Sequence, residues 1–185
     1  MLSLDDPRWE ILRFAHGSAK KIPPILRKIQ SAASRGVPFD FDSVSDLWEI
    51  CHQWSTYDAT YATLPHLTAI CSSLDPNNDL RISLLDLYGW AMVCLRLNST
   101  SAPNDIVSFF EMSVPVTREL IRQSLGDVTP GRSLRTLLGA LAGCSGDSEL
   151  GLAIYQLYDG TVHCDGCGAL IQPMRTGFNP LRRSK

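Results

Sequence analysis

The sequence predicts an all-α fold in which antiparallel helix pairs stack as a short solenoid, followed by a small β-hairpin. Apolar residues recur at helical spacing up to about residue 158, which is typical of helices with one buried face. Polar and proline-containing breaks divide this pattern into about eight helices of ~10–20 residues, and short connections favour antiparallel neighbours. No stretch before residue 160 alternates apolar and polar residues over a useful length, so strands are not expected there.

Length and composition are those of an ordinary globular protein. The chain has 185 residues, of which 44% are hydrophobic and 19% charged, and a chain of this length needs no disulfides to fold. The first residues lack the basic and apolar regions of a secretory signal, and no apolar run approaches the ~18 residues of a membrane span. We therefore expect a cytoplasmic protein whose six cysteines are thiols or metal ligands rather than bridges.

The first two predicted helices are marked by caps and stop signals. Asp6-Pro7 has the form of an N-cap with proline at the first helical position, and Gly17 is a stop signal. Ser18 is a cap for the next helix, whose apolar residues form one stripe before Gly36 ends it. The two prolines in its first turn fit, because amides there have no intrahelical acceptor.

The same signals predict six further helices, over residues 43–51, 57–74, 80–95, 103–125, 134–141 and 145–158. Pro65 lies inside the second of these and predicts a kink. The apolar stripe of the helix over 103–125 includes Phe109 and Val116. We expect a helical domain over residues 1–158, followed by a hairpin and basic tail over residues 159–185.

The sharpest local motif is a Cys-x-x-Cys-Gly sequence at residues 164–168, between two short apolar segments. This spacing lets two thiolates face one ion across a tight turn, as in the knuckle of a zinc ribbon. A structural zinc normally has four protein ligands, and only Cys164 and Cys167 are local. The alternative is a bare hairpin with two reduced thiols. The other ligands that the fold would have to bring near are Cys51, His52, His66 and Cys144.

A second group of chemically versatile residues lies between positions 51 and 66. Its members are Cys51, His52, Gln53, Tyr57, Tyr61, Pro65 and His66. Neighbours on a helix point about 100° apart, so the adjacent Cys51 and His52 are no indication of a nucleophile and its base. We expect His52 and Gln53 to form hydrogen bonds at a corner between helices, whereas the aromatic residues are candidates for binding.

Catalytic motifs are absent from the sequence. It contains no Gly-rich phosphate loop, no Gly-x-Ser-x-Gly and no His-Glu-x-x-His. No oxyanion-stabilising or orienting group accompanies the cysteine and histidine of the second group. The sequence therefore predicts a protein that is not an enzyme.

Charge is distributed unevenly although the net charge is −2. Residues 1–36 and the last residues are basic, whereas residues 37–86 carry eight acids and one arginine. An acidic face would favour a basic partner such as a nuclease, and the alternative is a solvated surface. The candidate partner-binding residues are Asp40, Asp42, Asp46, Glu49 and Asp58.

Three segments resemble a group of bacterial helical proteins. They are Asp6-Pro7-Arg8-Trp9, the stretch 47–67 with its Leu-Trp-Glu-Ile-Cys-His-Gln, Tyr-Asp-Ala-Thr-Tyr-Ala and Leu-Pro-His-Leu runs, and the motif at 164–168. The chain is similar there to bacterial HEAT-repeat-like proteins with a C-terminal Cys-x-x-Cys-Gly hairpin. Some of these are immunity proteins that protect a bacterium from its own secreted toxins. The resemblance implies a HEAT-like solenoid and carries over no catalytic residue.

The leading hypothesis is a cytoplasmic, non-catalytic protein-binding module, an immunity protein that occludes a toxin effector. One alternative is a metal-dependent enzyme or regulator in which Cys164 and Cys167 join histidines of the helical body. Another is a nucleic-acid-binding helical repeat that uses residues 13–35 and loses affinity steeply with salt. The acidic balance of the chain argues against nucleic acid, and no membrane partner is expected.

Overall fold

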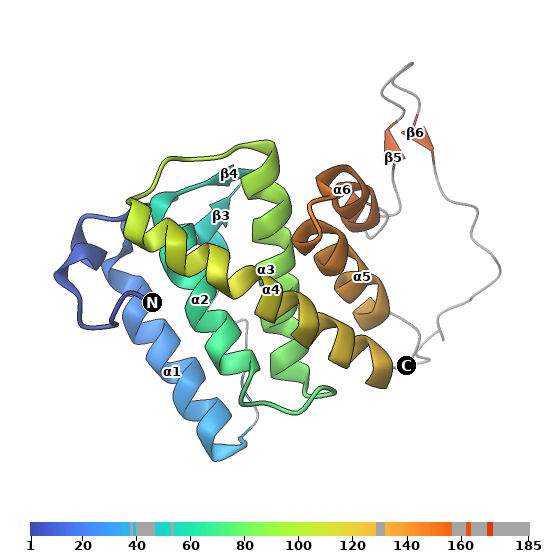
Figure 1. Cartoon of the computed structure of the whole chain (residues 1–185), viewed down its shortest axis with the longest axis horizontal. Coiled ribbons are helices and arrows are strands. Elements are labelled where there is room, and N and C mark those ends of the chain that lie inside the picture. Colours follow the sequence, from blue (N-terminus) through green and yellow to red (C-terminus); the bar gives the residue numbers. More distant parts are fainter. Residues whose placement is uncertain are drawn as a thin grey trace, which may run out of the picture.

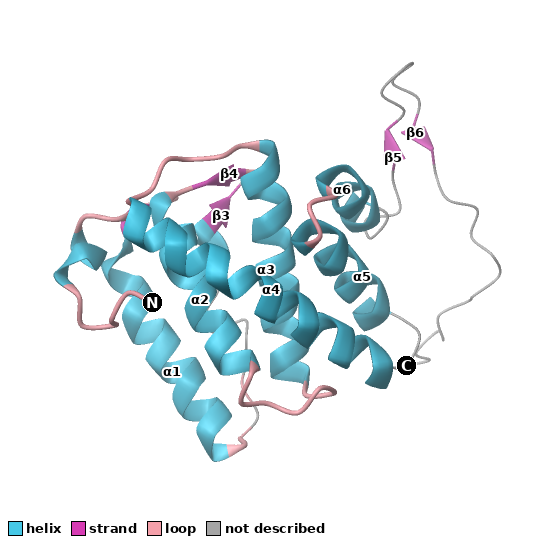
Figure 2. Cartoon of the chain, viewed as in Figure 1, coloured by secondary structure: helices cyan, strands magenta, loops and turns pink. Residues whose placement is uncertain are grey.

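The computed structural model describes residues 1–37, 39, 47–52, 54–128 and 132–156, together with residues 162–163 and 170–171. Helices make up most of this part of the chain (Figure 2), so the mainly helical class is confirmed. The α-helices are α1 (Ile22–Arg35), α2 (Asp58–Cys71), α3 (Asp79–Leu97), α4 (Asn104–Asp127), α5 (Arg132–Cys144) and α6 (Ser148–Gln156). Two short 3-10 helices, η1 (Pro7–Glu10) and η2 (Ala19–Lys21), precede α1.

Helix α3 lies in the middle of the molecule (Figure 1). It packs against α2 on one side and against α5 and α6 on the other. Helix α4 crosses in front of this layer and contacts α2 and α5, while α1 packs on α2 at one end. The centre of the fold is therefore a long helix with neighbours on several sides, and α4 presents one flank on each side of its buried face.

Several helix ends lie where the sequence predicts them. The Asp6 carboxylate accepts a hydrogen bond of 2.8 Å from the Arg8 amide, and Ser18 caps η2 in the same way. Gly36 ends α1 with a left-handed φ of 62°, a conformation that a side chain would disfavour. In the turn before α3, the Asn78 side chain accepts a hydrogen bond of 2.9 Å from the Leu80 amide.

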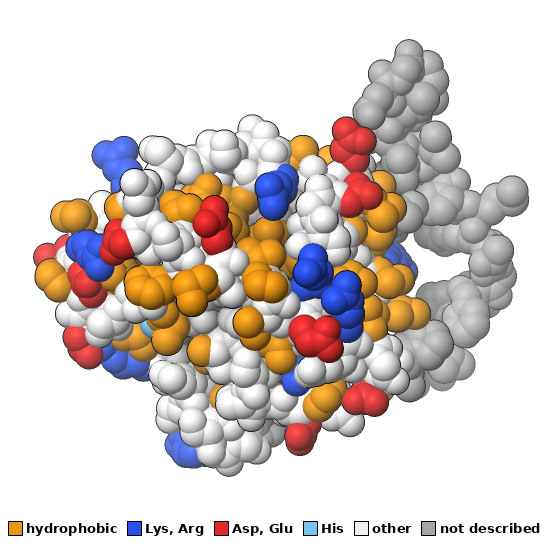
Figure 3. Space-filling model, in the orientation of Figure 1, with side chains coloured by type: hydrophobic (Ala, Val, Ile, Leu, Met, Phe, Trp, Pro, Cys, Tyr) orange, Lys and Arg blue, Asp and Glu red, His pale blue; other side chains and the backbone are white. Residues whose placement is uncertain are grey.

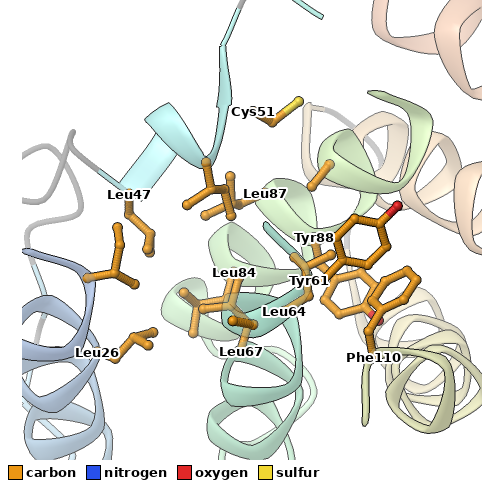
Figure 4. Close-up of a cluster of buried hydrophobic side chains, with 14 of the residues drawn as sticks. Leu26, Leu47, Cys51, Tyr61, Leu64, Leu67, Leu84, Leu87, Tyr88 and Phe110 are labelled. Carbon is orange, nitrogen blue, oxygen red and sulfur yellow. The ribbon is translucent and has the colours of Figure 1, made fainter. Parts of the chain in front are cut away.

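One continuous core joins the helices. The apolar residues predicted to share one face of α1 are buried. They belong to the same cluster as residues of α2 and of the segment that precedes α2. Figure 4 shows side chains from α1, α2, α3 and α4 converging in this cluster. The labelled residues are Leu26, Leu47, Cys51, Tyr61, Leu64, Leu67, Leu84, Leu87, Tyr88 and Phe110. Burial of apolar surface on this scale is the main contribution to the stability of the fold.

The prediction that no strands precede residue 160 is wrong. Strands β1 (Arg13–Phe14) and β2 (Gly17–Ser18) form an antiparallel pair, and so do β3 (Cys51–His52) and β4 (Ser55–Thr56). The predicted helix over residues 6–17 therefore ends after η1. Gly17, with a φ of 110°, belongs to the hairpin that turns the chain back. Strands of two residues are too short to show a period of two, so the sequence pattern did not reveal them.

The helix predicted over residues 43–51 is also corrected. Residues 43–46 lie outside the described residues, residues 47–50 form a 3-10 turn, and Cys51 begins β3. The β3–β4 turn holds Trp54 at a φ of 66°, which is unfavourable for a residue with a side chain. Two tertiary contacts hold it there: its ring lies 4.4 Å from that of Trp90, and its carbonyl accepts a hydrogen bond of 3.1 Å from Asn98.

At the position of the predicted C-terminal hairpin, β5 (Val162–His163) pairs antiparallel with β6 (Leu170–Ile171). Cys164 and Cys167 lie outside the described residues. The zinc knuckle therefore stays a prediction. The arrangement of the helices as a solenoid also stays a prediction.

Candidate functional site

Of the acidic residues predicted to bind a partner, the structure describes Glu49 and Asp58. Asp40, Asp42 and Asp46 lie outside the described residues. Asp58 opens α2, and its carboxylate accepts a hydrogen bond of 2.5 Å from the Arg13 amide of β1. Asp58 therefore holds the first hairpin to α2, whereas the partners of Glu49 lie in the two hairpins.

Glu49 lies between two histidines. Its Oε2 is 2.7 Å from His52 Nδ1 and 3.3 Å from His16 Nε2, and the two imidazole rings are 5.8 Å apart. The Glu49 carbonyl also accepts a hydrogen bond of 3.3 Å from the Ala15 amide. His52 was predicted to form hydrogen bonds at a corner between helices, but it lies in β3 and contacts a carboxylate. Among the described residues, no group of three or more His, Cys, Asp or Glu side chains is arranged to hold a metal ion.

The neighbouring Cys51 and His52 point to opposite sides of β3, because successive side chains alternate along a strand. Cys51 is buried, whereas the side chain of His52 is 39% exposed. The Cys94 thiol, hydrogen-bonded to Cys51, and burial both raise the pKa of Cys51. Burial also raises the pKa of Cys71 and of Cys144 to about 12, so these buried thiols stay protonated at neutral pH.

The remaining residues of the predicted 51–66 group are dispersed. Gln53 lies outside the described residues, and the Tyr57 amide donates to the Thr60 hydroxyl at the start of α2. Pro65 is buried inside α2, which continues past it. Tyr61 faces a surface cleft described below, so it is the one aromatic residue of this group that the structure places at a candidate binding site.

His66 is a buried structural residue. Its Nε2 lies 2.9 Å from the Leu2 carbonyl oxygen, and its ring lies 6.1 Å from that of Trp9. Burial lowers the pKa of His66 to about 4, although the hydrogen bond to Leu2 opposes this shift. The neutral ring therefore holds the N-terminal segment on α2.

The depressed pKa of His66 predicts acid sensitivity. An unfolded chain takes up the proton near pH 6.5, whereas the folded protein resists it down to about pH 4. We expect the free energy of unfolding to fall by about 3 kcal/mol as the pH drops through this window, and to be insensitive to His66 above it. His66→Gln keeps a donor for the Leu2 carbonyl and does not titrate. Denaturant unfolding should show a much smaller fall in this variant, and an unchanged fall would contradict the assignment.

The buried face of α4 is unusually polar. Ser113, Thr117 and Ser124 are buried on it, beside apolar residues. The Ser113 hydroxyl lies 2.9 Å from the Tyr88 hydroxyl, and the Thr117 hydroxyl lies 2.7 Å from that of Thr68. These hydrogen bonds therefore satisfy the hydroxyl groups of Ser113 and Thr117, which α4 buries against α3 and α2.

Hydrophobic side chains instead lie exposed on one flank of α4. Phe109 is 39% exposed, Met112 70% and Val116 47%, at the helical spacing i, i+3 and i+7. We call these three residues the α4 stripe. The prediction that Phe109 and Val116 belong to a buried face is wrong. In the sequence, the apolar residues of α4 extend over more than one face of the helix. Periodicity alone does not tell which of these faces is covered by other helices.

The other flank of α4 borders a cleft. Tyr61 of α2, Leu95 and Arg96 of α3, and Phe110 and Arg118 of α4 contribute to its lining. Its volume is about 420 Å³, within the range of small-ligand sites. At about 100° per residue, the cleft residues of α4 lie roughly opposite the α4 stripe. The face that α4 crosses shows hydrophobic side chains interspersed with charged ones (Figure 3).

Comparison of the chain with protein-family models, with curated proteins and with solved structures finds no match. No helix among the described residues is long and apolar enough to cross a membrane.

Proposed function

We propose that this protein is a non-catalytic protein-binding module that docks a partner on the α4 stripe. The observation that carries the proposal is the distribution of side chains on α4. Its buried face includes Ser113, Thr117 and Ser124 beside apolar residues, whereas Phe109, Met112 and Val116 are exposed. Single exposed apolar residues are normal on a protein surface, but neighbouring ones on one helix flank are typical of an interface.

The chemistry of the described titratable groups supports a binding role over a catalytic one. The buried thiols are protonated, and Cys51 does not face His52, so they form no activated nucleophile. Glu49 and Asp58, two of the acidic residues predicted to bind a basic partner, contact residues of the same chain. This weakens the case for an acidic docking surface. The proposal therefore shifts the docking surface from the acidic segment to α4.

The identity of the partner and the finer architecture are further parts of the proposal. The resemblance to HEAT-like immunity proteins suggests a bacterial toxin effector as the partner. Packing of consecutive helices, such as α2 with α3 and α5 with α6, is compatible with stacked pairs. A structural zinc at Cys164 and Cys167 would be a detail of the C-terminal hairpin, and the metal content of the purified chain with and without C164S/C167S tests it.

Substitution in the α4 stripe tests the docking surface. We expect Met112→Asp to weaken retention of a stoichiometric partner by about tenfold or more, because a charge replaces an apolar contact at the centre of the stripe. The measurement is affinity capture of the tagged protein from cells that also express its neighbouring genes.

Ile11→Asp is the matched control, since Ile11 is 74% exposed and belongs to no such stripe. It should retain the partner as the wild type does. Equal retention by the two variants, or no stoichiometric partner at all, would count against the proposal.

A further inference from the structure

The cleft between α3 and α4 combines an apolar floor with cationic walls. Its floor includes Met92, Leu95 and Val114, and the rings of Tyr61 and Phe110 meet edge to face there at 5.1 Å. Figure 4 shows these two rings next to each other. A chain or ring of carbon atoms would therefore find apolar contacts on this floor.

Hydrogen-bond donors with no partner in the described part of the chain surround this floor. Arg96 and Arg118 form no ion pair with another described residue, and the buried Nε of Arg118 has no hydrogen-bond partner there. The Tyr61 side chain is 9% exposed, and its hydroxyl hydrogen-bonds to no described residue. Burial raises the pKa of Tyr61, although Arg96 opposes the shift, so the phenol is a donor at neutral pH.

The charge balance of the lining defines the kind of anion. The two arginines face one acid, Glu111, so the lining carries a single net positive charge. A monoanion neutralises that charge, whereas a phosphate dianion would leave the cleft with a net negative charge. Guanidinium groups also match the planar geometry of a carboxylate with paired N–H donors.

We propose that this cleft binds a carboxylate borne on an apolar chain or ring, with the carboxylate on Arg96 and Arg118 and the apolar part on the Phe110 floor. This site is separate from the α4 stripe, which lies on the opposite flank of the helix. The inference therefore stands independently of the proposed protein partner.

The test compares octanoate with 1-octanol, which has the same chain and no charge. We expect saturable octanoate binding to the full-length chain by isothermal titration calorimetry, and binding of 1-octanol at least about tenfold weaker. Arg118→Gln should weaken octanoate binding about tenfold and leave 1-octanol unchanged. Arg122→Gln is the matched control, because Arg122 lies on α4 outside the cleft lining and forms an ion pair with Glu119.

Three results would overturn the proposal: no saturable octanoate binding at millimolar concentration, equal affinity for octanoate and 1-octanol, or no effect of Arg118→Gln. Circular dichroism of each variant excludes loss of fold as the cause of weaker binding. Met112→Asp should bind octanoate as the wild type does. A failure of the α4 stripe as a docking surface is thus distinguishable from a failure of the carboxylate site.

Discussion

The substitution Gly89→Ala is expected to lower the free energy of unfolding by about 3 kcal/mol. A Cβ at this position of α3 would lie 2.2 Å from the Cβ and 2.3 Å from the Cα of Ala140 in α5. It would also lie 2.8 Å from the Tyr155 hydroxyl. A flexible side chain can rotate away, but the Ala140 Cα is backbone. The clash is therefore relieved only if α5 shifts away from α3, which loosens the packing of both helices.

Gly126→Ala is the matched control for this substitution. Gly126 lies near the end of α4, and a Cβ there meets no atom within 4 Å. Because alanine favours a helix more than glycine does, this variant should be as stable as the wild type or more stable by up to about 1 kcal/mol. Urea denaturation of the two variants gives the comparison. Wild-type stability of Gly89→Ala would contradict the close contact of α3 with α5.

A second large effect is expected for Arg81→Ala, which should cost about 3 kcal/mol of unfolding free energy. Arg81 is 3% exposed, although it carries a charge. Its guanidinium donates hydrogen bonds to the Leu74 carbonyl at 2.8 Å, the Leu120 carbonyl at 2.9 Å and the Gln123 side chain at 3.0 Å. Arg81 thus links the connection between α2 and α3, through Leu74, to helix α4. Truncation removes these three hydrogen bonds and opens a cavity.

Arg122→Ala separates this role from loss of charge alone. Arg122 also lies on α4, two residues from Leu120 and therefore on a roughly opposite face. Its side chain is 54% exposed and lies 3.6 Å from Glu119. An exposed pair of this kind contributes little, so the variant should stay within about 0.5 kcal/mol of the wild type. A loss below about 1 kcal/mol for Arg81→Ala in urea denaturation would show that the three hydrogen bonds are dispensable.

Local signals in the sequence were sufficient to predict α1 to α6. Apolar residues recur at helical spacing in each, and residues such as Ser18 and Gly36 mark where helical structure begins or ends. Caps and apolar stripes act within a few residues, so they are legible without knowledge of the fold. The two predictions of helix that were wrong, over residues 6–17 and 43–51, concern segments in which contacts with distant residues decide the backbone.

The hairpins illustrate this limit. The Arg13 amide donates to Asp58, 45 residues further along the chain, and Trp54 is held by Trp90 and Asn98. A sequence window contains neither partner. The candidate site was hidden for the same reason: Tyr61 was noted as a binding candidate, but Arg96 and Arg118 come together with it only when α2, α3 and α4 pack.

The sequence by itself determined the helical class, the approximate positions of α1 to α6 and the buried stripe of α1. Only the tertiary structure decided that α4 buries Ser113 and Thr117 while Phe109 and Met112 face solvent. The spacing of residues in the sequence indicates which of them share a helix face, because each residue turns the helix by about 100°. Which face is covered depends on the neighbouring helices, and Tyr88 and Thr68 supply the hydrogen-bonding groups that allow a polar face to be buried.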